Sequence, residues 1–141
     1  MKLSARNILP GTVTKVTKGA VNAEVHLDLK SGDKIVSVIT NGSVDALGLK
    51  EGKNASAIIK ASWPILGKDI HNAKLSSRNI LCGTVAKVTP GAVNTEVSLK
   101  LKGGTVLTAI ITNESAHSLG FKEGDHACAA VKASSVILGV E

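Results

Sequence analysis

The sequence predicts an all-β protein built from two tandem small barrels, and two observations lead to that prediction. First, Leu3–Gly67 aligns without a gap with Leu75–Gly139, and more than half of the aligned pairs are identical, so the chain is a tandem duplication. Second, apolar residues at alternate positions of 21–29 are separated by polar Asn22, Glu24, His26 and Asp28, which is the pattern of a half-buried strand. The second copy repeats this alternation.

Each repeat contains the elements of a small Greek-key barrel. Turn residues at Gly19 and at 30–33 bracket the alternating strand, as expected in a meander. Asn41 or Ser43 is suited to cap a short helix that ends at Gly48. Together with a strand from the N-terminal segment, the order predicts two five-stranded barrels of the oligonucleotide/oligosaccharide-binding type. The other expected strands of the first repeat cover 15–17, 35–40 and 55–60.

The repeat also predicts the domain boundaries. We expect one domain at residues 1–68, a short polar linker at 69–72 and a second domain at 73–141. A unit of this size with few large side chains buries a modest core. We therefore expect the two copies to associate with each other, and then chains with chains.

Composition narrows the function. The formal net charge of +6 favours an anionic partner. Trp63 and Phe121 are the only aromatic residues, which is too few for the stacking surface of a single-strand nucleic-acid binder. No apolar run is long enough to span a bilayer and Arg6 interrupts any signal-peptide pattern, so we expect a cytoplasmic protein with no membrane partner.

The residues that most often carry chemistry are sparse. Cys82 and Cys128 match no zinc or CxxC spacing, and we expect buried thiols. The histidines at 26, 71, 117 and 126 have no metal-binding spacing, so no directly coordinated metal is expected. No nucleophile–base pair is recognisable, which argues against an enzyme.

Four polar groups recur in both copies where a barrel does not require them. A Ser-x-Arg-Asn segment supplies a guanidinium fork and a hydroxyl, and a Lys-Ala-Ser segment ends the last expected strand. A Thr-x-x-Ser pair begins the short helix, and a glycine turn could offer backbone amides to an anion. Each group also has a purely structural interpretation as a surface ion pair, a solvated strand end, a helix cap or a turn. Their joint content of donors favours a dehydrated tetrahedral dianion.

These motifs resemble the molybdenum-pterin-binding-protein (Mop) unit of the molbindins, also called a TOBE domain. Ser-Ala-Arg-Asn, Gly-Ala-Val-Asn-Ala-Glu-Val, Ile-Thr-Asn-x-Ser and Lys-Ala-Ser follow in the family's order. The second copy departs from the first at several positions, among them Ser77 for alanine, Pro90 for Lys18, and Ser135-Val136 for Trp63-Pro64. The resemblance implies a homotrimer of tandem units that binds molybdate or tungstate at subunit interfaces without catalysis. An oligonucleotide-binding-type module for nucleic acid is the alternative.

The resemblance also implies two sets of ligand residues. The interface oxyanion site maps onto Ser4, Ala5, Arg6, Thr40, Ser43, Lys60, Ala61 and Ser62, and onto Ser76, Ser77, Arg78, Thr112, Ser115, Lys132, Ala133 and Ser134. A second site near the threefold axis maps onto Gly19, Ala20, Val21 and Asn22, and onto Gly91, Ala92, Val93 and Asn94.

Overall fold

The computed structural model describes residues 1–141 apart from the side chain of His71, so the expectation for that histidine lies outside the described part of the chain. The first repeat begins with three antiparallel strands, followed by a short helix and two further strands. Its elements are β1 (Asn7–Lys18), β2 (Asn22–Leu29), β3 (Lys34–Thr40), α1 (Asn41–Leu47), β4 (Asn54–Ile59) and β5 (Ile65–Gly67).

The second repeat has the same order of elements after a short 3-10 turn, η1 (Ile70–Asn72). It contains β6 (Asn79–Pro90), β7 (Asn94–Leu101), β8 (Val106–Thr112), α2 (Asn113–Leu119), β9 (His126–Val131), η2 (Ala133–Ser135) and β10 (Ile137–Gly139).

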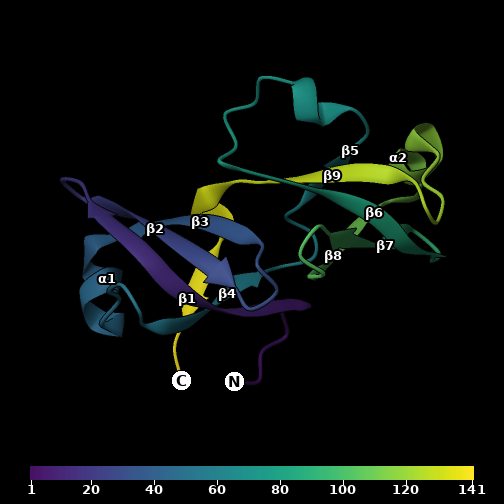
Figure 1. Ribbon diagram of the computed structural model, residues 1–141. Coiled ribbons are helices and arrows are strands. Elements are labelled where there is room, and N and C mark those ends of the chain that lie inside the picture. Colours follow the sequence, from purple (N-terminus) through teal and green to yellow (C-terminus); the bar gives the residue numbers. More distant parts are fainter.

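Two curled five-stranded sheets result, one for each half of the chain (Figure 1). Their strand orders are β10-β4-β1-β2-β3 and β5-β9-β6-β7-β8, and every pairing is antiparallel. The all-β prediction of two five-stranded units with one short helix each is confirmed.

The fifth strand of each sheet comes from the other repeat, which the sequence did not predict. Ile65 of β5 pairs with Ala130 of β9, and Ile137 of β10 pairs with Ile58 of β4. The expected N-terminal strand is instead continuous with the strand at 15–17, because β1 passes through a bulge between Val13 and Lys15. A division at residue 68 therefore separates the sequence repeats but cuts across both sheets.

The alternation in 21–29 positions the core as expected. Val25 and Leu27 are buried, whereas Glu24 and His26 on the opposite face of β2 are half-buried. Buried side chains of both halves belong to one continuous apolar cluster. The two halves thus share one core and are not independent domains joined by a linker.

Two buried asparagines join the halves. The side-chain amide of Asn7 donates to the carbonyls of Ile59 (3.1 Å) and Thr108 (2.8 Å), and its oxygen accepts from the Thr108 amide (2.8 Å). Asn79 makes the equivalent bonds to Val131 (3.1 Å) and to both backbone groups of Val36 (2.8 Å each). Each asparagine therefore acts like a strand residue towards the other half, with all of these polar atoms satisfied.

A disulfide links Cys82 to Cys128, so the expectation of two free thiols is wrong. The two residues are directly opposite each other where β6 pairs with β9. Sequence spacing does not reveal this, because the register of two distant strands is set by the fold. The equivalent pair in the first half is Pro10 opposite Ser56, which cannot form such a bond.

Candidate oxyanion site

The structure brings the Ser-x-Arg and Lys-Ala-Ser segments together in each half. Asn7 pairs with Ile59, so the next residues outward, Arg6 and Lys60, lie at the same end of the β1–β4 ladder. Asn79 pairs with Val131, which places Arg78 beside Lys132 in the same way. Each half thus presents one guanidinium and one ammonium group at a single strand end.

The β7–β8 hairpin of the second half lies against the first of these strand ends. The Ile110 amide donates to the Ala61 carbonyl (2.8 Å), and Arg6 forms an ion pair with Glu96. We call this contact the first junction. β8 ends two residues after Ile110, at Thr112, roughly 7 Å further along an extended strand. The Thr-x-x-Ser segment of the second half therefore begins close to the first junction.

The second junction is the equivalent contact between Arg78, Lys132 and Ala133 and the β2–β3 hairpin of the first half. η2, which begins at Ala133, packs against β3, and the Ser37 hydroxyl donates to the Val136 carbonyl (2.6 Å). Arg78 forms an ion pair with Glu24 on β2. The two junctions are related by the internal repeat.

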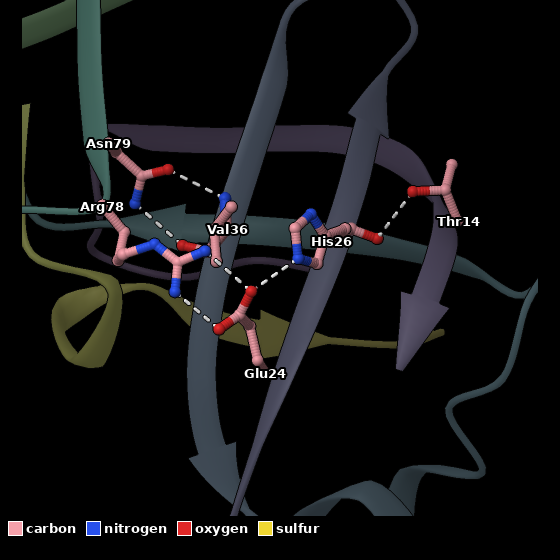
Figure 2. A network of polar contacts seen from close by, with 6 residues as sticks. All are labelled: Thr14, Glu24, His26, Val36, Arg78 and Asn79. Atoms are coloured by element: carbon pink, nitrogen blue, oxygen red, sulfur yellow. Dashed lines mark hydrogen bonds and ion pairs between the residues drawn. The ribbon is translucent and has the colours of Figure 1, made fainter. Parts of the chain in front are cut away.

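A carboxylate faces each arginine, although the sequence motifs had suggested groups of donors without one. Figure 2 shows Glu24 between two partners: it accepts from both terminal nitrogens of Arg78 (2.6 and 2.8 Å) and contacts His26 Nε2 (2.7 Å). The hydrogen bonds from Arg78 first, and then from His26, lower the pKa of Glu24 from 4.5 to about 2. The signal that could have located these carboxylates is the recurrence of Glu24 and Glu96 in both copies.

The lysines of the two junctions remain available to a ligand. Lys60 and Lys132 are exposed, and neither side-chain ammonium has an ion-pair or hydrogen-bond partner in the described part of the chain. Ser4, Ser62, Ser76 and Ser134 are exposed as well, whereas Ala61 and Ala133 are buried.

The Thr-x-x-Ser pairs cap the two short helices. The Thr40 hydroxyl oxygen accepts from the Ser43 amide (3.0 Å) and its hydroxyl donates to Ser43 Oγ (2.9 Å), and Thr112 does the same with Ser115. The N-cap is thus Thr40 and not Asn41 or Ser43, because Asn41 donates its side-chain amide to Gly19. The predicted helix end is confirmed: Gly48 is left-handed at φ 62°.

The glycine turns lie beside these caps. The Asn41 amide donates to the Val21 carbonyl (2.9 Å), and the Gly19 amide donates within its own turn to the Asn22 carbonyl (2.7 Å). In the second half the Asn113 amide donates to the Val93 carbonyl (3.0 Å), and the Gly91 amide donates to the Asn94 carbonyl (2.8 Å). The amides of Gly19 and Gly91 are therefore committed, which leaves the remaining groups of each turn for any ligand.

Within one half, the arginine–lysine pair is far from the glycine turn and the Thr-x-x-Ser cap. The arginine and lysine lie at the start of β1, whereas the glycine turn and the Thr-x-x-Ser cap lie beyond its end, twelve residues and roughly 40 Å away along an extended strand. A site that uses all of the expected interface residues must therefore combine different halves. Each junction combines residues of the two halves within a single chain.

No group of three or more His, Cys, Asp or Glu residues in the described part of the chain could hold a metal ion. None of the helices in the described residues is long and apolar enough to cross a membrane.

Comparison with known proteins identifies the family. The TOBE domain model matches residues 3–66 and again residues 75–138. The chain belongs to the TOBE domain family. The predicted family is thus confirmed, with one TOBE domain in each repeat.

Relatives of these TOBE domains carry molybdenum-related names. The chain is 46% identical to the molybdenum-pterin-binding protein MopA of Rhodobacter capsulatus, over 99% of the chain and 53% of that protein. It is 48% identical to molybdenum-pterin-binding protein 3 of Clostridium pasteurianum, over 44% of the chain and 91% of that protein. The chain spans about half the length of curated relatives such as MopA.

A solved structure matches both TOBE domains together. The cytoplasmic molybdate-binding protein ModG, with molybdate bound, superposes with a TM-score of 0.95 at 50% identity, and the match covers 100% of both chains. The order and arrangement of the two domains, including the exchanged strands, are therefore those of a fold in which molybdate has been observed.

Proposed function

We propose that this chain binds molybdate or tungstate and serves in the intracellular storage and homeostasis of these oxyanions. The observation that carries the proposal is the pair of junctions, each with an arginine and an unpaired lysine side by side at one strand end. Hydroxyls and backbone amides around them are donors that a tetrahedral dianion needs when it leaves water. The full-length similarity to ModG, which was solved with molybdate, supports the same ligand.

The proposed ligand residues are those at the junctions and at the caps. One set combines Ser4, Ala5, Arg6, Lys60, Ala61 and Ser62 with a cap of the Thr112–Ser115 type, and its repeat combines residues 76–78 and 132–134 with a cap of the Thr40–Ser43 type. Ala5 would act through its amide, so Ser77 preserves that contact. We assign a second, separate site to the glycine turns at 19–22 and 91–94.

We further propose that the chain assembles as a homotrimer. Large apolar side chains are exposed at equivalent positions of both halves, which is the pattern expected of a surface covered by other copies. These pairs are Leu3 and Leu75 (50% and 48% exposed), Val21 and Val93 (70% and 73%), and Ile65 and Ile137 (70% and 49%).

We place the protein in the cytoplasm, as ModG is, and assign it binding without catalysis. The nucleic-acid alternative has no support from the relatives named above.

Calorimetric titration with molybdate, tungstate and sulfate, combined with light scattering, tests the ligand and the assembly. We expect similar affinity for molybdate and tungstate, and sulfate weaker by at least about tenfold, because shorter sulfur–oxygen bonds stretch the hydrogen bonds of a rigid site. Equal binding of sulfate would reduce the site to a general anion patch. A monomer of 14.4 kDa that binds molybdate with full affinity would contradict the proposed trimer.

Substitution of the junction cations tests the residues. Arg6→Ala and Lys60→Ala should each weaken molybdate binding by about 2 to 4 kcal/mol, because each removes a charged donor from a dianion that is desolvated when it binds, and truncating one partner of such a charge pair costs about 2 to 5 kcal/mol. The matched control is Lys15→Ala, which removes an exposed lysine from β1, the strand that follows Arg6, at the bulge away from the junction. Unchanged affinity in both junction variants would show that Arg6 and Lys60 are surface residues only.

A further inference from the structure

Each junction arginine is paired with a carboxylate of the opposite half. Arg78 donates through both terminal nitrogens to the two oxygens of Glu24, the bidentate geometry in which a guanidinium binds a carboxylate most strongly. Arg6 donates through Nη2 alone to Glu96, and its other nitrogens have no partner within the described residues. The two arginines are therefore held to different extents.

The residue two positions after each glutamate adds a second difference. His26 follows Glu24 on the same face of β2 and contacts it at 2.7 Å (Figure 2). The equivalent residue after Glu96 is Ser98, whose side chain makes no hydrogen bond to Glu96 in the described part of the chain. Glu24 is thus fixed from two sides, and Glu96 from one.

We propose that Glu24 and Glu96 act as positioning residues that hold the site arginines until an oxyanion displaces them, and that His26 makes the second junction the harder one to open. An oxyanion then fills the first junction, at Arg6, before the second, at Arg78. This inference rests on the function proposed above and adds an order of filling to it.

Competition for the same donors is the physical basis. A tetrahedral oxyanion prefers the same paired N–H groups of a guanidinium that Glu24 already uses, so both acceptors cannot take them at once. A dianion beside a carboxylate also repels it. Binding at Arg78 must therefore break two hydrogen bonds from the arginine and release a glutamate that His26 retains. Binding at Arg6 breaks one and can begin at nitrogens that have no partner.

Exchange of the residues at positions 26 and 98 tests this order. Sodium molybdate is titrated calorimetrically, at constant neutral pH, into wild type, His26→Ser and Ser98→His. Wild type should show two classes of junction site. His26→Ser should tighten the weaker class by about three- to tenfold, the equivalent of one net hydrogen bond, and Ser98→His should weaken the stronger class by a similar factor. His117→Ser, on the exposed face of α2, is the matched control and should change neither class.

The outcomes separate this inference from the function on which it rests. If the wild-type protein binds no molybdate, the proposed function is wrong. Wild type that binds molybdate, while both exchange variants keep the two affinities unchanged, overturns the order of filling and leaves the function intact. Glu24→Gln provides a second reading, because the amide holds Arg78 less strongly and should tighten the weaker class by at least as much as His26→Ser does. Thermal unfolding of each variant distinguishes these changes from loss of fold.

Discussion

The two halves of the chain share the arginine, asparagine and glutamate that join them at the junctions, but they differ at an internal cross-strand pair that only the second half links covalently. Arg6, Asn7 and Glu24 all recur in the second copy, and every one of them, or its twin, bonds to the opposite half. By contrast, the disulfide of the second half replaces Pro10 and Ser56 of the first. Because the halves exchange their last strands, a change at a junction affects both sheets, whereas an internal pair can vary in one half alone.

The hairpin loops show where the internal symmetry must break. The loops at 30–33 and 102–105 meet, and Asp33 accepts hydrogen bonds from the amides of Gly103 (2.8 Å) and Thr105 (3.3 Å). Burial alone would raise the pKa of Asp33, but these hydrogen bonds outweigh it and hold the pKa below its ordinary value. A Cβ at Gly103 would lie 2.6 Å from the Ser31 carbonyl oxygen, so a side chain there has no room. The positions of the second loop that are equivalent to Ser31 and Asp33 hold Gly103 and Thr105, so only the first loop carries the acceptor.

Removal of the disulfide should have the largest effect on stability. Reduction, or Cys82→Ser with Cys128→Ser, should lower the free energy of unfolding by about 2 to 4 kcal/mol, because the unfolded chain regains the freedom of a closed loop. The two cysteines are separated by 46 residues. Chemical denaturation with and without dithiothreitol measures the loss, and the double serine variant should not respond to the reductant. Equal stability of the oxidised and reduced protein would contradict this prediction.

Asn7→Ala and Asn79→Ala test whether the two halves are joined equally. Each substitution removes three hydrogen bonds between buried groups and should cost about 3 kcal/mol, at about 1 kcal/mol for each bond. Urea denaturation measures both variants, with exposed Asn22→Ala as the control that should change stability little. A large loss in one variant and none in the other would show that only one asparagine joins the halves.

The repeat, the alternating strand and the C-terminal end of the helix could be predicted from the sequence because they depend on local patterns, whereas the N-cap, Thr40, was missed. Alternation identifies β2, and Gly48 marks the end of α1 through its own backbone conformation. The strand exchange could not be predicted. Both copies end in the same Ile-Leu-Gly segment, so the pattern fits a partner in either half equally well.

The residue types of the site could be predicted from the sequence, but the ion pairs between them could not. Recurrence in both copies drew attention to Arg6 and Lys60, and the ladder between β1 and β4 brings them together. The carboxylates opposite the arginines lie on strands of the other half, at a register that depends on how the halves pack. The same holds for the disulfide, whose partners meet only through the pairing of β6 with β9.

Ala23→Thr should stabilise the first half by supplying a donor that the second half already has. The buried side-chain oxygen of Asn41 has no hydrogen-bond partner among the described residues, whereas that of Asn113 accepts from the Thr95 hydroxyl (2.6 Å). Ala23 occupies the position equivalent to Thr95, so the new hydroxyl should contribute about 1 kcal/mol. Ala23→Val, which has the same shape without the donor, is the control for thermal and chemical denaturation. Equal stability of the threonine and valine variants would contradict the hydrogen bond.

Acid titration of Glu24 should give the smallest effect, because the Arg78 guanidinium is half-exposed and exposed ion pairs contribute little. Arg78, and after it His26, hold the pKa of Glu24 at about 2, below the ordinary 4.5. The unfolded protein therefore binds a proton at Glu24 before the folded protein does. The contribution of Glu24 to stability is complete above its ordinary pKa and is lost as the pH falls from there towards the pKa of the folded protein.

The Glu24→Gln variant has no carboxylate at this position that could bind a proton. The difference in free energy of unfolding between wild type and Glu24→Gln should thus be constant near neutral pH and shrink as the pH falls from 4.5 to about 2. Urea denaturation across this range measures the difference, and a gap that stays constant through it would mean that Arg78 and His26 do not hold Glu24 in its charged form.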